Sequence, residues 1–233
     1  PMRILMITEN DPAGTGILFS RALNAYTEHE CRLVTTQTRY NHAFPKDIHV
    51  PCLDEQGFDE LRHELERADV FHFHLIHDEN LDLGGLFARD YMQGKGIVHH
   101  HHGHPDFRGN PEKYREKYAV LGRRNLLVST PDLLKLLPEA KWQPNLVPVA
   151  DPAYRPVAER QQSSSVCFGH SPTRKDLKNT DEFLRVIKRL DSRHPGKVRC
   201  DLIDDAPHAQ CLQRKQQCDV VFDHMQGYYG MSS

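Results

Sequence analysis

The chain has 233 residues with 30 basic and 32 acidic side chains. This near balance gives no electrostatic reason to expect binding to nucleic acid. No apolar run approaches the roughly 20 residues that span a bilayer. We therefore expect a cytoplasmic protein without a transmembrane segment, for which peripheral association with a membrane stays open. Six cysteines occur without a Cys-x-x-Cys pair, which favours reduced thiols over a structural zinc site or a disulfide framework.

The first 150 residues alternate short β-rich runs with amphipathic segments, a pattern typical of a parallel sheet with crossover helices. The predicted strands are Arg3–Thr8, Cys31–Thr36, Asp69–His74, Gly96–His101 and Asn125–Ser129. One helix should end near Leu23, and apolar side chains spaced by three or four residues predict another over 58–68. Thr130 should cap a short helix that runs through Leu137.

A proline-rich stretch then predicts a linker over 151–164, followed by a second α/β domain over 165–233. Its predicted strands are Ser165–Gly169, Val198–Ile203 and Asp219–Asp223, and its predicted helices are Asn179–Arg193 and Ala209–Gln217. Asn179 and Glu182 have the spacing of a capping box. Three strands are few for an independent parallel sheet. We expect this domain to be incomplete, and Met2 to be the native start.

A glycine-containing loop, Glu9–Gly16, follows the first strand. Gly14 and Gly16 would let backbone N–H groups approach an anion at the start of the helix, where the helix dipole also favours negative charge. Phe19 occupies the third glycine position of a dinucleotide fingerprint, so that motif is weak. A tight turn without a ligand is an equally favoured alternative.

Eight histidines lie at the ends of two predicted strands: His72, His74, His77, His99, His100, His101, His102 and His104. The carboxyl ends of parallel strands line the ligand crevice. Alternation along the strand should put His99 and His101 on one face and His100 and His102 on the other. A metal site, a catalytic or substrate-positioning histidine, and buried structural histidines are the competing interpretations. Because no helical His-x-x-x-His register or acidic ligand pattern accompanies them, we expect no metal.

A cationic loop joins the first strand of the second domain to its helix, and it carries Arg174, Lys175 and Lys178. Cations beside a helix N-terminus form a strong site for a phosphate, with Arg suited to bidentate contact. An exposed basic loop is the alternative, and spacing alone does not separate the two.

Taken in order, these segments resemble the GT-B glycosyltransferases, in particular the retaining, family-4-like group. The series runs from Met2–Leu5 and the glycine loop through Val98–Gly103, Leu127–Pro131 and Asn145–Asp151 to Phe168–His170, Lys178–Thr180, Asp219–Asp223 and Tyr229–Gly230. The resemblance covers nearly the whole chain, and its specific part is the order of loose motifs. It implies two Rossmann-like parallel-sheet domains, the first on the acceptor side and the second on the donor side.

The resemblance also implies roles for particular residues. His102 would be catalytic and lie near the donor sugar, while Arg174 and Lys178, with Gly14 and Gly16, would bind the donor diphosphate. Three further residues are candidates for positioning the substrate, and these are His74, His104 and Asn10. The spacing of four residues between the two cations, and an asparagine after Lys178 in place of glycine, depart from the family pattern.

The predicted function is hexosyl transfer from a nucleotide-sugar donor to a glycan, lipid or small-molecule acceptor, with no cofactor and no metal requirement. The family's pair of glutamates lies beyond Gly230, so we expect this chain to be inactive by itself. The alternatives are a sugar-nucleotide epimerase on the same fold, a metal-dependent hydrolase built on the histidines, and a non-catalytic binding fragment.

Overall fold

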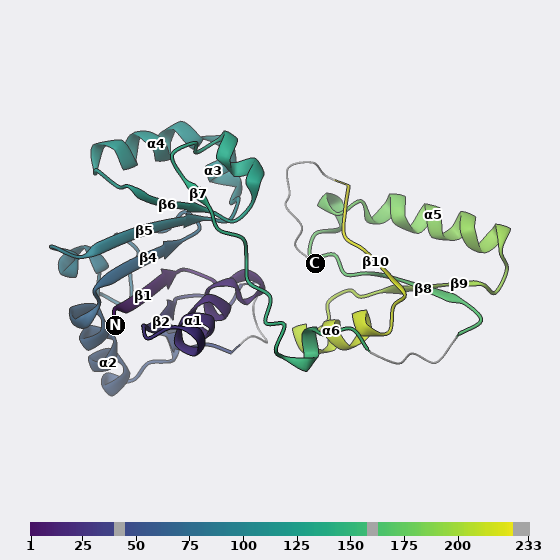
Figure 1. Cartoon of the computed structure of the whole chain (residues 1–233), viewed down its shortest axis with the longest axis horizontal. Coiled ribbons are helices and arrows are strands. Elements are labelled where there is room, and N and C mark those ends of the chain that lie inside the picture. Colours follow the sequence, from purple (N-terminus) through teal and green to yellow (C-terminus); the bar gives the residue numbers. More distant parts are fainter. Residues whose placement is uncertain (40–44, 158–162, 226–233) are drawn as a thin grey trace. The chain divides into compact units, whose positions relative to one another are not determined.

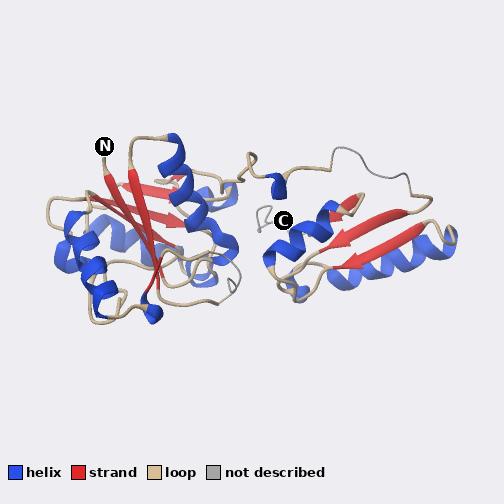
Figure 2. Cartoon of the chain, turned by 90° about the horizontal axis from the view of Figure 1, so that it is seen from below, coloured by secondary structure: helices blue, strands red, loops and turns tan. Residues whose placement is uncertain are grey.

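Two parallel sheets organise the chain, as the computed structural model shows for residues 1–39, 45–157 and 163–225. The chain divides into two units, Pro1–Val147 (unit 1) and Pro148–Ser233 (unit 2). Each unit has a sheet flanked by helices (Figures 1 and 2). The α/β fold with two parallel-sheet domains, predicted from alternating strands and helices, is confirmed. The motif at Tyr229 and Gly230 lies outside the described residues.

Unit 1 contains a seven-stranded sheet in the order β3-β2-β1-β4-β5-β6-β7, and every pair is parallel. The strands are β1 (Arg3–Thr8), β2 (Glu30–Thr35), β3 (Ile48–His49), β4 (Val70–His74), β5 (Gly96–His101), β6 (Asn125–Val128) and β7 (Lys141–Trp142). All five predicted strands are present. The sequence did not reveal β3 and β7, because two residues are too short to display an alternating pattern.

Four α-helices accompany the described part of this sheet: α1 (Thr15–Tyr26), α2 (Glu55–Arg67), α3 (Pro105–Gly109) and α4 (Pro111–Val120). The sequence analysis missed α4, whose buried side chains are only Tyr114 and Tyr118. An apolar face of two tyrosines among charged residues gives a weak helical period. The predicted helix after Thr130 is a 3-10 segment over Pro131–Lys135, and the Thr130 side chain does not cap it. That capping prediction was wrong.

The two faces of the unit 1 sheet have separate cores. Met6 packs with Ile17 and Phe19 of α1 on one face, whereas Ile7 packs with Leu61 and other side chains of α2 on the opposite face. Successive residues of a strand point to opposite faces. Since Met6 is paired with His72, the even-numbered histidines of β4 lie on the α1 face.

Unit 2 has a three-stranded parallel sheet in the order β10-β8-β9. Its elements are β8 (Val166–His170), α5 (Thr180–Arg193), β9 (Val198–Leu202), α6 (His208–Gln216) and β10 (Val220–Phe222). Helices α5 and α6 lie on opposite sides of the sheet (Figure 1). Helix α5 joins β8 to β9 on one side, and α6 joins β9 to β10 on the other side of β8. Because both crossovers are right-handed, the two helices cover opposite faces. The predicted strands and helices of this segment are all present.

The capping box predicted at the start of α5 was wrong. Asn179 adopts a left-handed conformation with φ of 53° and makes no side-chain cap. Its Oδ1 atom instead accepts a hydrogen bond from the Met225 backbone at 2.9 Å. Asparagine tolerates this backbone region better than most residues, so Asn179 ties the loop before α5 to the segment after β10.

Within the described residues, no helix is long and apolar enough to cross a membrane.

Candidate functional site

Each sheet has one point at which the connections leave in opposite directions. In unit 1 this point lies between β1 and β4, and in unit 2 between β8 and β10. Ligands of open α/β sheets bind outside the carboxyl ends of the strands at such switch points. The loops after these four strands therefore define two candidate sites, one in each unit. Most of the residues predicted from the sequence lie beside them.

The loop after β1 is organised by the carboxylate of Asp11. Its two oxygens accept hydrogen bonds from the backbone N–H groups of Gly16 at 2.6 Å and Ile17 at 3.1 Å. These are amides at the start of α1, where an anion was expected to bind. Burial raises the pKa of Asp11 to about 6, although the two hydrogen bonds act in the opposite direction. A protein carboxylate thus holds the position that the sequence suggested for phosphate.

The two glycines of this loop also have structural reasons to be glycine. Gly14 has φ of 65°, in the left-handed region that favours glycine. A Cβ atom on Gly16 would lie 3.0 Å from Leu33 and 3.1 Å from the Asp11 carboxylate. Diphosphate binding by Gly14 and Gly16 stays a prediction, and it now requires displacement of Asp11.

Asn10 links the same loop to a neighbouring segment. Its side-chain amide donates to the backbone carbonyl of Arg39 at 3.2 Å, and the backbone carbonyl of Asn10 accepts a hydrogen bond from Thr8 Oγ1 at 2.7 Å. Across the switch point, the carboxylate of Glu9 lies 3.9 Å from His77 after β4. The side chain of Asn10 therefore supports the loop, and a contact with substrate is a separate prediction.

Leu75 is a feature of this site that sequence reasoning missed. It directly follows β4 and has φ of 62°, a conformation that is costly for a bulky residue. Its N–H donates to the carbonyl of His100 at 2.9 Å. Strained backbone of this kind concentrates at functional sites, but no feature of the sequence marks it.

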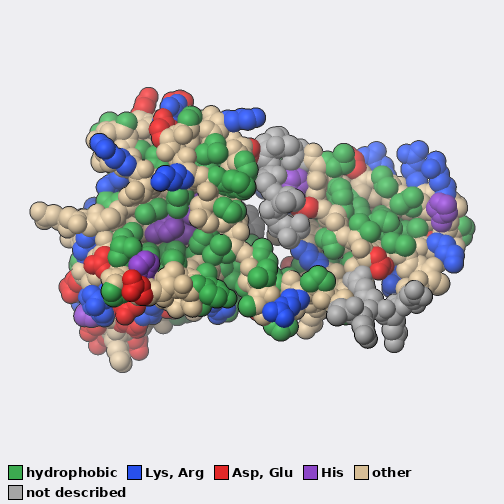
Figure 3. All heavy atoms as spheres, viewed as in Figure 1, with side chains coloured by type: hydrophobic (Ala, Val, Ile, Leu, Met, Phe, Trp, Pro, Cys, Tyr) green, Lys and Arg blue, Asp and Glu red, His purple; other side chains and the backbone are tan. Residues whose placement is uncertain are grey.

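Four histidines gather on the α1 face at the carboxyl half of β4 and β5: His72, His74, His100 and His102. The rings of His100 and His102 lie 4.2 Å apart, and His74 stacks parallel to His102 at 5.2 Å. His74 Nδ1 and His102 Nε2 share a hydrogen bond of 3.0 Å. Figure 3 shows histidine side chains (purple) among hydrophobic ones (green) on the surface of unit 1, whereas His72, His74 and His100 are buried beneath that surface.

These imidazoles are neutral near pH 7. Burial lowers the pKa of His102 to about 4 and that of His74 well below its usual value, and nearby imidazoles lower the pKa of His74 further. A neutral His102 accepts or donates a hydrogen bond. At neutral pH it lacks the second ring proton with which an imidazolium acts as a general acid. The structure brings together two predicted site residues, His74 and His102.

The other two histidines of β5 point to the opposite face, as alternation predicted. His101 stacks on Phe107 at 3.9 Å, and its Nε2 atom hydrogen-bonds to the hydroxyl of Tyr118 at 2.7 Å. His99 packs beside Phe73 at 5.4 Å. His101 therefore has a structural role between the sheet and helices α3 and α4.

His104 begins α3. Its Nδ1 atom accepts a hydrogen bond from the Asp106 backbone N–H at 3.2 Å, in the manner of a helix cap. Burial lowers its pKa. This capping role accounts for His104 without a substrate, so its contribution to binding stays a prediction.

In unit 2, the predicted cations pair with carboxylates. Lys178 Nζ lies 2.8 Å from Asp223, which follows β10, and both side chains are largely buried. Arg174 contacts Asp176 through Nε at 2.9 Å. The third cation, Lys175, pairs with Asp204. The loop after β8 and the end of β10 are thus joined at the switch point by a buried ion pair.

His170 closes the base of the unit 2 site. Its Nδ1 atom lies 3.0 Å from the Phe222 carbonyl, and its Nε2 atom lies 2.9 Å from Thr180 Oγ1 at the start of α5. Both ring nitrogens are therefore used within the protein. The carboxylates of Asp181 and Glu182 follow in the first turn of α5, where they already interact with the positive end of the helix dipole.

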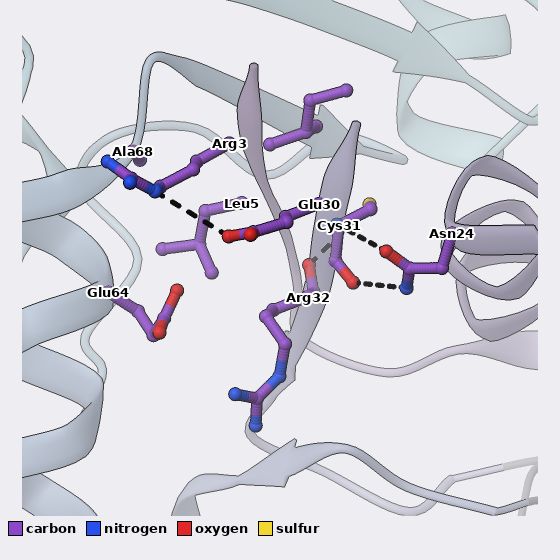
Figure 4. A pocket seen from close by; sticks show the side chains of 9 residues that line it. Arg3, Leu5, Asn24, Glu30, Cys31, Arg32, Glu64 and Ala68 are labelled. Carbon is purple, nitrogen blue, oxygen red and sulfur yellow. Dashed lines mark hydrogen bonds and ion pairs between the residues drawn. The ribbon is translucent and has the colours of Figure 1, made fainter. Parts of the chain in front are cut away.

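A pocket of about 220 Å³ lies away from both sites, at the amino ends of β1 and β2 (Figure 4). Arg3 and Glu30 form an ion pair of 3.5 Å across it. Asn24 bonds to both the N–H and the carbonyl of Cys31, each at 2.8 Å. Because these polar groups are satisfied within the chain, and because ligands of such sheets bind at the opposite edge, we assign no site here.

No family model and no curated protein matches the chain. Among solved structures it is similar to the glycotransferase of kitacinnamycin, at 13% identity and a TM-score of 0.45, over 87% of this chain and 65% of the other. It is also similar to a UDP-GlcNAc 2-epimerase from Neisseria meningitidis bound to UDP-GlcNAc, at 12% identity and a TM-score of 0.42, over 98% of this chain and 74% of the other. The chain thus spans just under two thirds of the first structure. Likeness at this level carries no conclusion about activity.

Proposed function

We propose that the protein is a nucleotide-sugar enzyme of the GT-B type that transfers a hexosyl group to a glycan, lipid or small-molecule acceptor. The observation that carries the proposal is the position of Lys178. It lies in the loop between β8 and α5, at the switch point of a parallel sheet, which is where phosphates bind in this architecture. The order of motifs along the sequence supports the same class.

Lys178 would stabilise the diphosphate as it leaves the sugar. Charge develops on the leaving oxygen when the glycosidic bond breaks, and a fixed cation in a partly buried position stabilises that charge. Lys178 is held in place by Asp223 at 2.8 Å. A diphosphate carries more negative charge than one carboxylate, so it competes for Lys178, and Arg174 can exchange Asp176 for a bidentate phosphate contact.

In unit 1, His102 would orient the donor sugar. Its Nε2 atom bonds to His74 at 3.0 Å, so the orientation of the ring is fixed by a second imidazole. Because burial keeps the pKa of His102 near 4, the ring acts as a neutral hydrogen-bonding group rather than as an acid. In this proposal the chemistry uses no cofactor.

Epimerisation is the alternative reaction of the same class. Both reactions need stabilisation of a departing nucleoside diphosphate, and Lys178 would serve either. Transfer consumes donor in proportion to acceptor, whereas epimerisation changes the sugar without net loss of donor. Product analysis with UDP-sugars and GDP-sugars, with and without simple glycan acceptors, separates the two.

The test of the phosphate site is calorimetric titration with pyrophosphate, UDP and GDP. Pyrophosphate is included because it reports the phosphate contacts independently of the base. Lys178→Ala should weaken binding at least tenfold, and Arg174→Ala should weaken it less because that side chain is exposed. Lys188→Ala removes a cation from an exposed position of α5 and serves as the matched control. Unchanged affinity in Lys178→Ala would refute the proposal.

A further inference from the structure

The α1 face of unit 1 contains buried histidine nitrogens that the proposed function does not use. Three side chains from β4 and β5 are involved, and His72, His74 and His100 are 8%, 3% and 0% exposed. Each offers one ring nitrogen to a group whose members all lie within 4.8 Å of one another. His74 and His100 are register partners on adjacent strands, and His72 is two residues before His74 on the same face.

These nitrogens lack hydrogen-bond partners. His72 Nε2 and His74 Nε2 are buried without one, and neither ring nitrogen of His100 forms one. Burying a polar group without a partner costs about 1–3 kcal/mol, and most buried polar side-chain atoms in proteins are paired. The contrast with His170, whose two ring nitrogens both bond within the protein, shows that the fold supplies partners elsewhere. Four unpaired ring nitrogens on three adjacent histidines therefore call for a ligand.

We propose that His72, His74 and His100 bind a single divalent transition-metal ion, with zinc the best match. Imidazole is a preferred ligand of zinc, which binds it at about 2.0–2.1 Å. Tetrahedral bonds of that length place the ligand nitrogens about 3.3 Å apart. The three nitrogens now lie within 4.8 Å of one another, so binding would draw them closer by up to about 1.5 Å.

The hydrogen bond between His74 and His102 fits this assignment. A histidine that ligates a metal almost always donates its other ring N–H to a neighbouring acceptor. When His74 Nε2 binds the ion, His74 Nδ1 carries the proton and donates to His102 Nε2, a contact of 3.0 Å that is already present. His102 is then a positioning residue for the metal ligand, in addition to any contact with a sugar.

Among the described residues, no carboxylate or thiolate belongs to this cluster. Three neutral ligands leave the full charge on the ion, and three protein ligands leave the fourth position to water. Such a site lowers the pKa of its bound water to about 7. The site would therefore be of the open type, which binds water or an oxygen atom of a substrate, rather than a closed structural site.

The test is titration of the chelator-stripped chain with Co²⁺, whose visible spectrum reports four-coordinate binding, followed by displacement with Zn²⁺. One tight equivalent is expected. X-ray absorption of the zinc-loaded chain should show nitrogen ligation with three imidazoles and no sulfur. This measurement needs no variant, and the absence of a tight equivalent, or a signal from fewer than three imidazoles, would overturn the proposal.

Two variants locate the site, and a third variant is the control for binding by other members of the chain's 16 histidines. His72→Phe and His100→Phe keep an aromatic ring for stacking and should weaken the tight equivalent at least 100-fold. His99→Phe removes a neighbour of His100 that is 2% exposed and also unpaired but faces the other side of the sheet, so it should retain binding. Equal affinity in all three would assign the binding to adventitious histidines, which would refute the site.

Discussion

The switch points of the two sheets use the same topology with opposite chemistry. In unit 1, neutral imidazoles stack at the carboxyl ends of β4 and β5, and several of their nitrogens lack partners. In unit 2, Lys178 and Asp223 neutralise each other, and both nitrogens of His170 are bonded. Parallel α/β topology thus indicates where a ligand would bind, while the side chains decide whether that position carries charged groups or neutral hydrogen-bonding groups.

Ligand binding should have a different cost in the two sites. The charged groups of unit 2 are already paired, so a ligand must exchange partners there, at a cost that its own charge offsets. In unit 1 the neutral rings have no such partners, and a ligand adds contacts without breaking any between charged groups. We therefore expect substitutions in unit 1 to affect chemistry or metal binding, and substitutions in unit 2 to affect phosphate affinity.

The largest expected effect is that of His102→Ala. If the ring orients the donor sugar, its loss should lower release of nucleoside diphosphate from UDP-sugars or GDP-sugars at least 100-fold, because positioning contributes strongly to catalysis. This turnover is measured in a protein long enough to carry the family's pair of glutamates. Affinity for pyrophosphate should not change, since Lys178 belongs to unit 2. His99→Phe is the matched control on the same strand. Near-normal turnover in His102→Ala would assign the ring a structural or metal-positioning role.

A second expected difference between the units is a pH dependence of stability. In unit 1 it arises from Asp11, a buried carboxylate in the loop after β1. Its pKa is raised from 3.8 to about 6, so the folded state binds the proton more tightly than the unfolded state does. The stabilisation is fully present below about pH 4 and is lost as the pH rises through about 6. The difference amounts to about 3 kcal/mol, at about 1.4 kcal/mol for each pKa unit.

Asp11→Asn should remove this dependence. The free energy of unfolding of the natural chain, relative to that of the variant, should fall by about 2–3 kcal/mol between pH 4 and pH 7. Carboxyl carbon NMR of labelled aspartate gives the pKa of Asp11 directly. A measured pKa near 4, with a difference between the two proteins that is constant over this pH range, would contradict the prediction.

The sequence predicted the helices and strands better than it predicted the contacts between them. Short β-rich runs located β1, β4 and β5, and alternation separated the faces of His100 and His101, because both are local properties of a strand. It did not reveal that Asp11 takes the amides at the start of α1. Nor did it indicate that Leu75 adopts a positive φ. The first depends on how the loop after β1 folds onto the start of α1, and the second accompanies a hydrogen bond from Leu75 to His100 on the neighbouring strand.

The grouping of His72, His74 and His100 could not be predicted from the sequence for a related reason. A helical His-x-x-x-His register lies within one segment, whereas His74 and His100 come together only through the pairing of β4 with β5. Likewise, Lys178 was predicted to bind a diphosphate, and its partner Asp223, which lies 45 residues later in the chain, was not predicted. Register between strands and the order of strands in a sheet are not encoded in the period of either strand.

The smallest predicted effect concerns that ion pair. Asp223→Asn removes the carboxylate that competes with phosphate for Lys178, and the local charge becomes more positive, so affinity for pyrophosphate should rise about three- to tenfold. Asp204→Asn removes the partner of the exposed Lys175 and should change the affinity by less than twofold, because exposed pairs are well screened. The gain in Asp223→Asn should diminish at high salt, as expected for a contact between charges. Weaker binding in Asp223→Asn would mean that the carboxylate orients Lys178 for the ligand rather than competing with the ligand. The two sites would then differ less than their ligand-free geometries indicate.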